Sequence, residues 1–380
     1  MRRRYLAVVA CCLAVLLPGC KTPNPLPVEF YSTGPDHVLP PVSVFGTGIS
    51  DELTAACAAG RCTQGPELVG GIYAQFRRSE MFEAVIAGEN KSDYQLKIAA
   101  RRIDPDDAKE FAKLMTSAAT LFVVPVVMSH EYRAEFALFW RGVPLTSYTF
   151  RVPYDETVYL GKDLQQSQKF ATESLASKFL AKAEEEGIFT ADYLYAALKA
   201  ENYHQDLKAA TQVGAFELTN RLIYPDPWLG AQLHYQRSQE HEWADVYVYP
   251  IRQVEWSDAD KTLSAEIQSA LKDVDIAVKS GAYKAASFEP PQVATMNTSH
   301  AKGKVARGFV DDSKQRYRSY VYLFIAKDKF VKFRISQPDT GAPAVEPTAF
   351  VDELLAGLQV PDESLFTATA RQNKRNSGIQ

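Results

Sequence analysis

Apolar and polar residues alternate along the chain in two patterns, which together predict a mixed α+β protein. Apolar stripes at helical spacing mark residues 66–85, 165–186 and 263–279. Residues 94–100 alternate apolar and polar side chains, which predicts a strand with one buried face. Hydrophobic runs bounded by turn residues predict further strands at 41–45, 132–140, 143–154, 243–251, 302–310, 316–326 and 330–336, a strand after the proline-rich turn within 221–235, and a last helix at 348–358.

One segment of this pattern, residues 118–128, is apolar and almost uncharged, so insertion into a membrane is an alternative to burial in the protein. A membrane helix needs about 20 apolar residues, and Pro125 would interrupt one. A buried strand is therefore the favoured interpretation.

The predicted elements fall into two groups, which indicates two domains. We expect an N-terminal α+β domain at 42–188, a helical connector at 189–218 and a C-terminal α/β domain at 219–361. Residues 362–380 are predicted to be a flexible tail, because the end of the chain lacks an apolar period. The fold class expected is α+β, with two α/β sandwich domains whose sheets are mainly antiparallel.

The N-terminus carries the features of a secretory leader: three arginines, an apolar run and a small residue before a cysteine. The stretch Leu17-Pro18-Gly19-Cys20 resembles the lipobox of bacterial lipoproteins. The resemblance implies that residues 1–19 are removed as a signal peptide and that Cys20 receives a diacylglyceryl thioether and an amide-linked acyl chain such as palmitate. Residues 20–41 then form a tether from the lipid, rich in proline and favouring extended structure.

Two other interpretations of the leader remain: an ordinary secretory signal and an uncleaved membrane helix, for which the apolar run is short. Lys21, in place of Asp, resembles the sorting pattern for the outer membrane. We therefore expect a protein anchored to the periplasmic face of the cell outer membrane by the acyl chains on Cys20. Inner-membrane retention and a surface-exposed orientation stay open.

Cysteine usage indicates the compartment of the protein, and its net charge indicates which partners are disfavoured. Cys57 and Cys62 are predicted to form one disulfide in an oxidising compartment, with Gly60 supplying the break in helix that pairing requires. Without the leader, 39 basic residues stand against 46 acidic ones, a formal charge of −7. This balance argues against nucleic acid as a partner and against a polybasic membrane patch.

A family resemblance covers the C-terminal part of the chain, residues 219–361. The start Tyr-Pro-Asp-Pro-Trp-Leu-Gly at 224–230, the strand around 247–250, the following helix and the hairpin 316–336 together resemble Mog1/PsbP-like domains. The first domain is similar in element order to anticodon-binding-like modules of periplasmic lipoproteins. The resemblance implies an α/β/α sandwich, and neither family pattern brings a catalytic motif, so the ligand stays open.

Motifs for common enzyme chemistries are missing from the sequence: HExxH, GxSxG, a P-loop and GxGxxG. Ser129, His130 and Glu131 are adjacent, but neighbours on a strand point to opposite faces and do not form a triad. Asp311 and Asp312 indicate a solvated turn, with calcium as the alternative. We therefore predict no catalytic residue, no metal ligand and no cofactor.

Tyrosines in the second domain are the most suggestive side chains. Tyr247, Tyr249, Tyr317, Tyr320 and Tyr322 exceed what one buried face would hold, so they are candidates for a partner surface. The alternative is that they are amphipathic aromatics that span the core and the surface.

The function predicted from these features is that of a lipid-anchored lipoprotein of the cell envelope, acting as a non-enzymatic binding or scaffold protein. Its expected partners are the lipid bilayer, through the acyl chains on Cys20, and an envelope protein. Two alternatives remain: an envelope hydrolase whose site is assembled from distant residues, and a lipoprotein that binds a small ligand in an apolar cleft.

Overall fold

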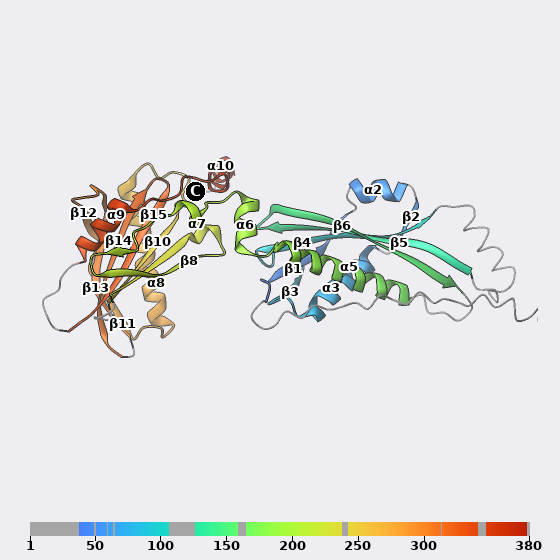
Figure 1. Ribbon diagram of the computed structural model, residues 1–380, viewed down its shortest axis with the longest axis horizontal. Coiled ribbons are helices and arrows are strands. Elements are labelled where there is room, and N and C mark those ends of the chain that lie inside the picture. The colour runs from blue at the N-terminus through green and yellow to red at the C-terminus, as the bar shows by residue number, and fades with distance from the viewer. Residues whose placement is uncertain are drawn as a thin grey trace, which may run out of the picture. The chain divides into compact units, whose positions relative to one another are not determined.

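The computed structural model describes residues 38–48, 51–58, 60–63, 65–105, 126–158, 165–237, 242–312, 314–340 and 347–377. The chain divides into two compact units, Met1–Phe189 and Thr190–Gln380 (Figure 1). Each unit has its own mainly antiparallel sheet with helices packed on it, which confirms the predicted α+β fold class. The leader, Cys20 and most of the tether lie outside the described residues, as does most of the predicted strand 118–128.

The first unit is built on a six-stranded sheet in the order β3-β1-β4-β5-β6, with β2 paired to β4 (Figure 1). β1 pairs in parallel with β3 and β4, and the other pairs are antiparallel. The strands predicted at 41–45, 94–100, 132–140 and 143–154 are confirmed. The bounds are β1 Val42–Gly46, β2 Gly60–Thr63, β3 Val85–Ala87, β4 Tyr94–Pro105, β5 Val126–Trp140 and β6 Val143–Val158.

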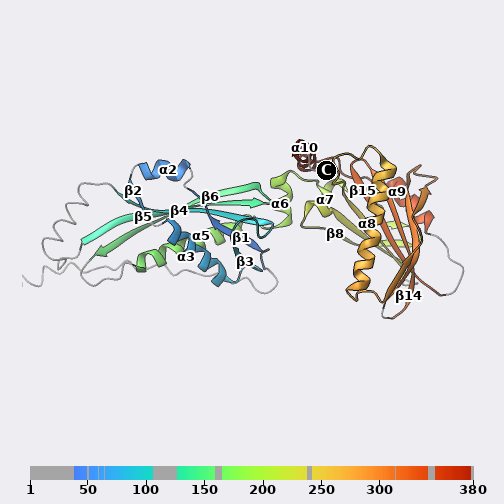
Figure 2. The same ribbon diagram turned by 180° about the vertical axis from the view of Figure 1, so that it is seen from behind.

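Two helices, α3 (Gly65–Ser79) and α5 (Gln165–Glu186), pack against the sheet and against each other (Figure 2). Their apolar stripes meet the sheet, and Phe136 on β5 stacks on Phe179 of α5 at 4.8 Å between ring centroids. The two helices approach so closely that a Cβ on Gly71 would lie 2.5 Å from the Thr172 side chain. This contact therefore favours a residue without a Cβ at position 71.

Helix α3 ends earlier than the predicted boundary at 85. Glu80, the residue after the helix, has a left-handed backbone with φ 54°, and the Ser79 hydroxyl donates to the carbonyl of Phe76. The residues that follow leave the helix and pair with β1 as strand β3. Pairing with a parallel neighbour therefore overrides the helical spacing of the last apolar residues.

The second unit contains a nine-stranded, fully antiparallel sheet in the order β11-β13-β14-β15-β10-β9-β8-β7, with β12 paired to β13. The predicted strands from 221 onward are confirmed with small shifts of boundary. The bounds are β7 Gln212–Val213, β8 Phe216–Ile223, β9 Ala231–Arg237, β10 Glu242–Pro250, β11 Ala285–Phe288, β12 Gln292–Thr295, β13 Lys302–Asp311, β14 Arg316–Ala326 and β15 Lys329–Pro338.

A helix packs on each face of this sheet, which gives three layers. On one face α9 (Thr348–Gly357) places Phe350 and Leu354 in the larger hydrophobic core. On the other, α8 (Ala259–Lys279) buries Leu263 and Ile267, and it packs mainly against β11, β13 and β14 (Figure 2). Alternate residues of β13 and β14 therefore face different helices.

The predicted helical connector, 189–218, is wrong for most of its length. Helices α6 (Ala191–Leu198) and α7 (Tyr203–Asp206) begin it, but β7 and the start of β8 then join the sheet. Buried apolar residues hold this segment to the core of the second unit: Tyr203, Leu207, Val213 and Phe216. The second unit consequently starts at Thr190, about 30 residues earlier than predicted.

The predicted flexible tail, 362–380, is also wrong. Leu365–Ser377 forms helix α10, whose Phe366 packs against Trp228 at 5.1 Å between ring centroids. The Arg371 side chain is buried and donates to the carbonyl of Ile251. Because polar contacts hold this helix in place, its sequence shows no apolar period.

A single carboxylate on α9 anchors the turn between β12 and β13. Asp352 accepts hydrogen bonds from the backbone N–H groups of Asn297, Thr298 and Ser299. These bonds hold the pKa of Asp352 well below its usual range. The carboxylate therefore stabilises the fold at pH values above the unfolded pKa of about 3.9, and this contribution is lost as pH falls toward the folded value.

We therefore expect Asp352→Asn to lower the melting temperature at pH 7, and the difference from the native chain to shrink steadily between about pH 4 and pH 2. Thermal unfolding followed by circular dichroism at several pH values measures this. A difference that stays constant from pH 7 to pH 2 would mean that the charge of Asp352 does not stabilise the turn.

Candidate functional site

The structure separates the five candidate tyrosines into buried and accessible ones. Tyr320 and Tyr322 are 5% and 1% exposed and lie in the core beneath α9. The prediction that they belong to a partner surface is therefore wrong. They occupy the positions of β14 whose side chains point to the α9 face, and the spacing of the tyrosines alone does not reveal which face is covered.

Tyr317, Tyr247 and Tyr249 lie on the opposite, α8 face of the sheet and are half-buried. The ring of Tyr317 packs edge-on against Trp243 at 4.9 Å between centroids. Tyr247 and Tyr249 instead line a cavity of about 490 Å³, well within the range of small-molecule sites. The structure thus brings two of the five tyrosines together in a site.

We call this cavity the tyrosine pocket. It is enclosed by β10, β15, α8 and the segment around η1 (Pro227–Leu229), and its chemistry comes mainly from six side chains: Tyr224, Tyr247, Tyr249, Glu266, Asp273 and Lys332. Leu229, Pro250 and Phe330 add apolar wall, and Arg252 and Gln253 add polar groups. Aromatic faces and charges of both signs therefore meet in one cavity.

Strand register places the central side chains. β10 and β15 are antiparallel, so Tyr247 lies opposite Lys332, and Tyr249 lies opposite Phe330. The Lys332 ammonium consequently sits over both tyrosine rings, 5.0 Å from the centroid of Tyr247 and 5.3 Å from that of Tyr249. Such contacts stabilise a partly desolvated cation.

Sequence reasoning missed Tyr224, Glu266, Asp273 and Lys332 as site residues, and of these Lys332 had a recognisable signal. It alternates with the buried Val331 and Phe333, which places it on the other face of β15. That alternation was visible in the sequence, whereas the pairing of β15 with β10 was not. A lysine on the face opposite two buried neighbours was the available signal.

Burial governs the electrostatics of the pocket. Within the described residues no carboxylate lies within 4 Å of the Lys332 ammonium, and burial lowers the pKa of Lys332, against the opposing effect of Glu266 and Asp273. The Tyr249 hydroxyl donates to Glu266 Oε1 at 2.7 Å, and burial first, then Glu266, raises the pKa of Tyr249. Both tyrosines therefore stay neutral at physiological pH, since burial also raises the pKa of Tyr247.

A chain of hydrogen bonds holds the wall beside the pocket. The Tyr224 hydroxyl donates to Gln232 Oε1 at 2.7 Å, and Gln232 Nε2 donates to Asp245 Oδ1 at 2.7 Å. The same oxygen lies 2.7 Å from His234 Nδ1. These contacts fix the orientation of Tyr224, which follows β8, through side chains of β9 and β10.

The adjacent residues Ser129, His130 and Glu131 do not assemble into a catalytic group. The Ser129 hydroxyl donates to Asp155 at 2.7 Å, and Glu131 pairs with Arg133. The His130 ring is buried on the other face of β5, where it packs against tyrosines. Alternation along the strand separates them, as predicted.

The Asp311-Asp312 pair forms a turn. Asp312 accepts the backbone N–H groups of Lys314 and Gln315, and these bonds lower the pKa of its carboxyl. In the part of the chain that the structure describes, no group of three or more histidine, cysteine, aspartate or glutamate side chains is arranged to hold a metal ion.

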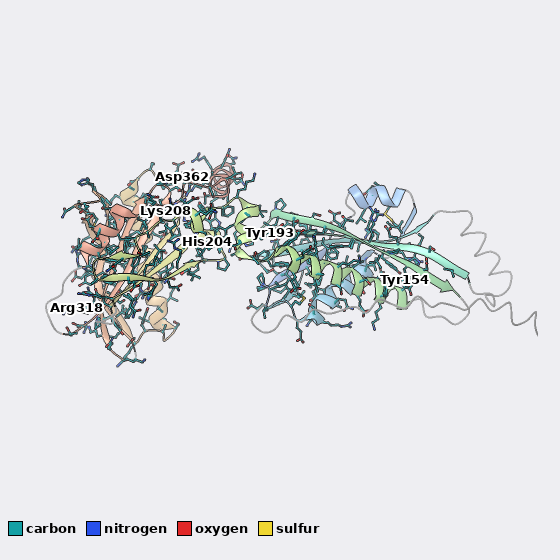
Figure 3. All side chains as sticks on the ribbon, viewed as in Figure 1. Tyr154, Tyr193, His204, Lys208, Arg318 and Asp362 are labelled. Carbon is teal, nitrogen blue, oxygen red and sulfur yellow. A yellow bond between two sulfur atoms is a disulfide. The ribbon has the colours of Figure 1, made fainter. Side chains whose placement is uncertain are left out.

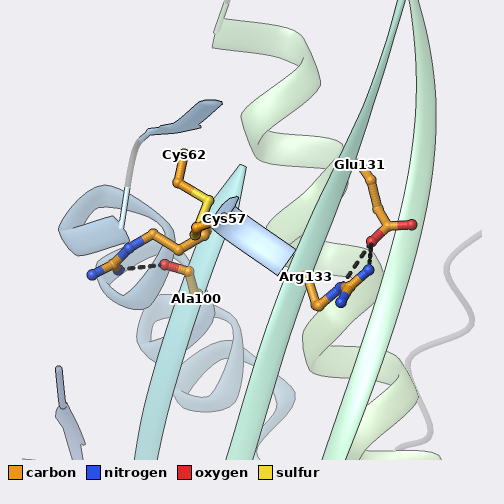
Figure 4. Close-up of a disulfide and its surroundings, with 6 residues drawn as sticks. Cys57, Cys62, Ala100, Glu131 and Arg133 are labelled. Atoms are coloured by element: carbon orange, nitrogen blue, oxygen red, sulfur yellow. Dashed lines mark hydrogen bonds and ion pairs between the residues drawn. A yellow bond between two sulfur atoms is a disulfide. The ribbon is translucent and has the colours of Figure 1, made fainter. Parts of the chain in front are cut away.

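Cys57 and Cys62 are joined by a disulfide between α2 (Asp51–Ala58) and β2 (Figure 4). The helix ends at Ala58 and the strand begins at Gly60, so the break lies where the sequence predicted it. The bridge closes a short loop at the edge of the first unit's sheet, which makes it a local constraint.

Replacing both cysteines with serine is expected to lower the free energy of unfolding by about 2 kcal/mol, because the bridge restricts only a short loop in the unfolded chain. Chemical denaturation of the double variant measures this, with the native protein under reducing conditions as the matched control. An unchanged midpoint, or two free thiols in the native protein under oxidising conditions, would contradict the prediction.

A second cavity of about 720 Å³ lies beside α7 and the turn between β14 and β15. Its lining is rich in charged residues, including Lys208 and Asp362 (Figure 3). Lys327 donates to the carboxylate of Asp362 at 2.6 Å and to the carbonyl of Val360 at 2.9 Å. Because these bonds occupy the charges of Lys327 and Asp362, the tyrosine pocket is the stronger candidate.

No helix among the described residues has the length and apolar character needed to cross a membrane.

Comparison with known proteins gives likeness of structure only. No family model matches the chain, and no curated protein matches it. Among solved structures, the chain is similar to the cyanobacterial PsbP of Synechocystis, with 10% identity and a TM-score of 0.28, over 41% of this chain and 92% of that protein. A DUF330 protein of Xanthomonas campestris matches with 13% identity and a TM-score of 0.25, over 40% and 88% of the two chains.

A third similar structure is the type VI secretion immunity protein TplEi of Pseudomonas aeruginosa, with 9% identity and a TM-score of 0.21, over 72% of this chain and 93% of that one. A PsbP protein is thus among the structural neighbours. Scores of this size assign no function.

Proposed function

We propose that this protein is a lipid-anchored, non-enzymatic binding protein of the bacterial cell envelope, and that the tyrosine pocket is its ligand site. The observation that carries binding is the pocket itself. Its aromatic faces and its ammonium and carboxylate groups are suited to hold and orient a ligand.

The anchor is supported by the sequence. The Leu17-Pro18-Gly19-Cys20 stretch resembles a lipobox, and each buried methylene of an acyl chain contributes about 0.8 kcal/mol to membrane binding. Two or three such chains hold a protein on a bilayer without a membrane helix. The Cys57–Cys62 disulfide supports an oxidising compartment such as the periplasm. Lys21, directly after the cysteine, supports localisation to the outer membrane. An envelope protein remains the proposed macromolecular partner.

Cellular fractionation tests the anchor. In a bacterial host we expect the native chain in the outer-membrane fraction and Cys20→Ala in the soluble periplasmic fraction or as unprocessed precursor, because the variant has no thiol to lipidate. Cys12→Ala is the matched control, since it removes a cysteine from the same leader outside the lipobox. If Cys20→Ala stayed on the membrane and was processed at the same site as the control, the anchor would be ruled out.

A further inference from the structure

Charged side chains stand on two walls of the tyrosine pocket, and no salt bridge within 4 Å joins the walls among the described residues. On the β15 side, the Lys332 ammonium lies over two tyrosine rings and has no carboxylate within 4 Å among the described residues. On the α8 side, Glu266 uses one carboxylate oxygen for Tyr249, and no described residue hydrogen-bonds the other or pairs with Asp273. The charges on the two walls therefore act on each other across the cavity without a direct ion pair, and each can still pair with a ligand group of opposite charge.

The balance of positive and negative side chains in the pocket indicates the charge of the ligand. Lys332 and Arg252 carry two positive charges, and Glu266 and Asp273 carry two negative ones. A simple anion would meet the two carboxylates, and a simple cation would meet the ammonium and guanidinium groups. A molecule with a positive group at one end and a negative group at the other satisfies both walls with charge-assisted hydrogen bonds.

The space between the walls accepts a short apolar body. The cavity of about 490 Å³ has Leu229 and Phe330 in its lining beside the tyrosine rings. We infer that the tyrosine pocket binds a small zwitterion with free amino and carboxylate ends, a free amino acid or a short peptide, with the carboxylate toward Lys332 and the amino group toward Glu266. This inference rests on the proposed function, since it names the ligand class of the same pocket.

Isothermal titration calorimetry of the full, detergent-extracted chain with the dipeptide alanyl-leucine tests the inference. We expect saturable binding of the free dipeptide, and binding at least ten-fold weaker for N-acetyl-alanyl-leucine and for alanyl-leucine amide, because each lacks one of the two charges. Equal binding of the free and blocked forms, or no binding of the free dipeptide, would overturn the inference.

Two variants test which side chain binds each end of the ligand. Lys332→Met keeps an unbranched side chain, one atom shorter and without charge, and should weaken binding of the free dipeptide at least ten-fold. It should change binding of the amide little, because the amide has no carboxylate to lose. Glu266→Gln should also weaken binding of the free dipeptide at least ten-fold, and it should change binding of the N-acetyl form little. Lys302→Met, at an exposed position of β13, is the matched control and should bind as the native chain does.

Melting temperatures show whether each variant folds, and Lys332→Arg, which keeps the charge, should restore part of the binding. If neither Lys332→Met nor Glu266→Gln affects the free dipeptide in folded protein, the pocket is not its site. Fractionation of Cys20→Ala does not depend on the pocket. Lost dipeptide binding with normal anchoring would therefore overturn the ligand class alone, and lost anchoring with intact binding would overturn the anchor alone.

Discussion

Arg371→Ala is expected to lower the free energy of unfolding of the second unit by about 3–5 kcal/mol, the range measured when one partner of a buried ion pair is removed. Arg371 is 6% exposed, and Nη2 lies 3.2 Å from Asp328 Oδ2. The same guanidinium donates to the carbonyl of Ile251 at 2.7 Å. Removing it leaves a buried carboxylate and a carbonyl without these partners.

The neighbours of this pair increase the expected effect. Lys329 is fully buried between Asp328 and Glu201, and Thr367 on α10 donates to Glu201 at 3.0 Å. α10, the β14–β15 turn and the segment before α7 are therefore joined through one charged network. Loss of Arg371 should release α10 as well as weaken the unit.

Urea unfolding followed by tryptophan fluorescence measures this change, because three of the four tryptophans lie in the second unit. Arg375→Ala is the matched control: it is also on α10, but its side chain is 62% exposed and pairs with Glu255 at the surface. Such a pair is worth at most about 1 kcal/mol. Equal effects of the two substitutions would show that the buried network does not hold the helix.

Gly230→Ala is expected to destabilise the second unit by about 3 kcal/mol or more and to abolish binding in the tyrosine pocket. Gly230 has φ 65°, which side chains rarely adopt. A Cβ there would lie 2.0 Å from the carbonyl oxygen of Val248 and 2.8 Å from the Cα of Tyr249. β10 would have to move at the tyrosines that form the pocket.

Gly214→Ala is a control that has the backbone strain of Gly230→Ala without its steric clash. Gly214 also has a left-handed backbone, with φ 56°, but a Cβ there would meet no atom within 4 Å. We expect a loss of about 1–2 kcal/mol for this control and unchanged ligand binding. Urea unfolding and dipeptide titration of both variants measure these effects. A Gly230→Ala protein as stable as Gly214→Ala would contradict the close approach of η1 to β10.

Sequence periodicity predicted the elements whose burial follows a regular pattern. Helix α5 and strand β14 have the predicted bounds, and Arg141-Gly142 forms the predicted turn between β5 and β6, with positive φ at both residues. In these elements local spacing and tertiary packing agree, so a window of ten to twenty residues contains the necessary information.

Elements held by distant polar contacts were not predictable in this way. α10 shows no apolar stripe because Arg371 and Thr367 bind groups far away in sequence. The tyrosine pocket depends on the pairing of β10 with β15, which brings Lys332 to Tyr247 across a separation of 85 residues. Which of the tyrosines are buried follows from the position of α9, and spacing within one strand does not contain that information.

The lipid anchor on Cys20 is the central claim of this account, and the mass of the N-terminal peptide tests it most directly. The protein would be extracted from bacterial membranes, digested and measured by mass spectrometry. We predict a peptide that begins at Cys20 and carries a diacylglyceryl group with a further acyl chain on its amino group. A peptide that begins elsewhere, or that begins at Cys20 without lipid, would contradict the claim.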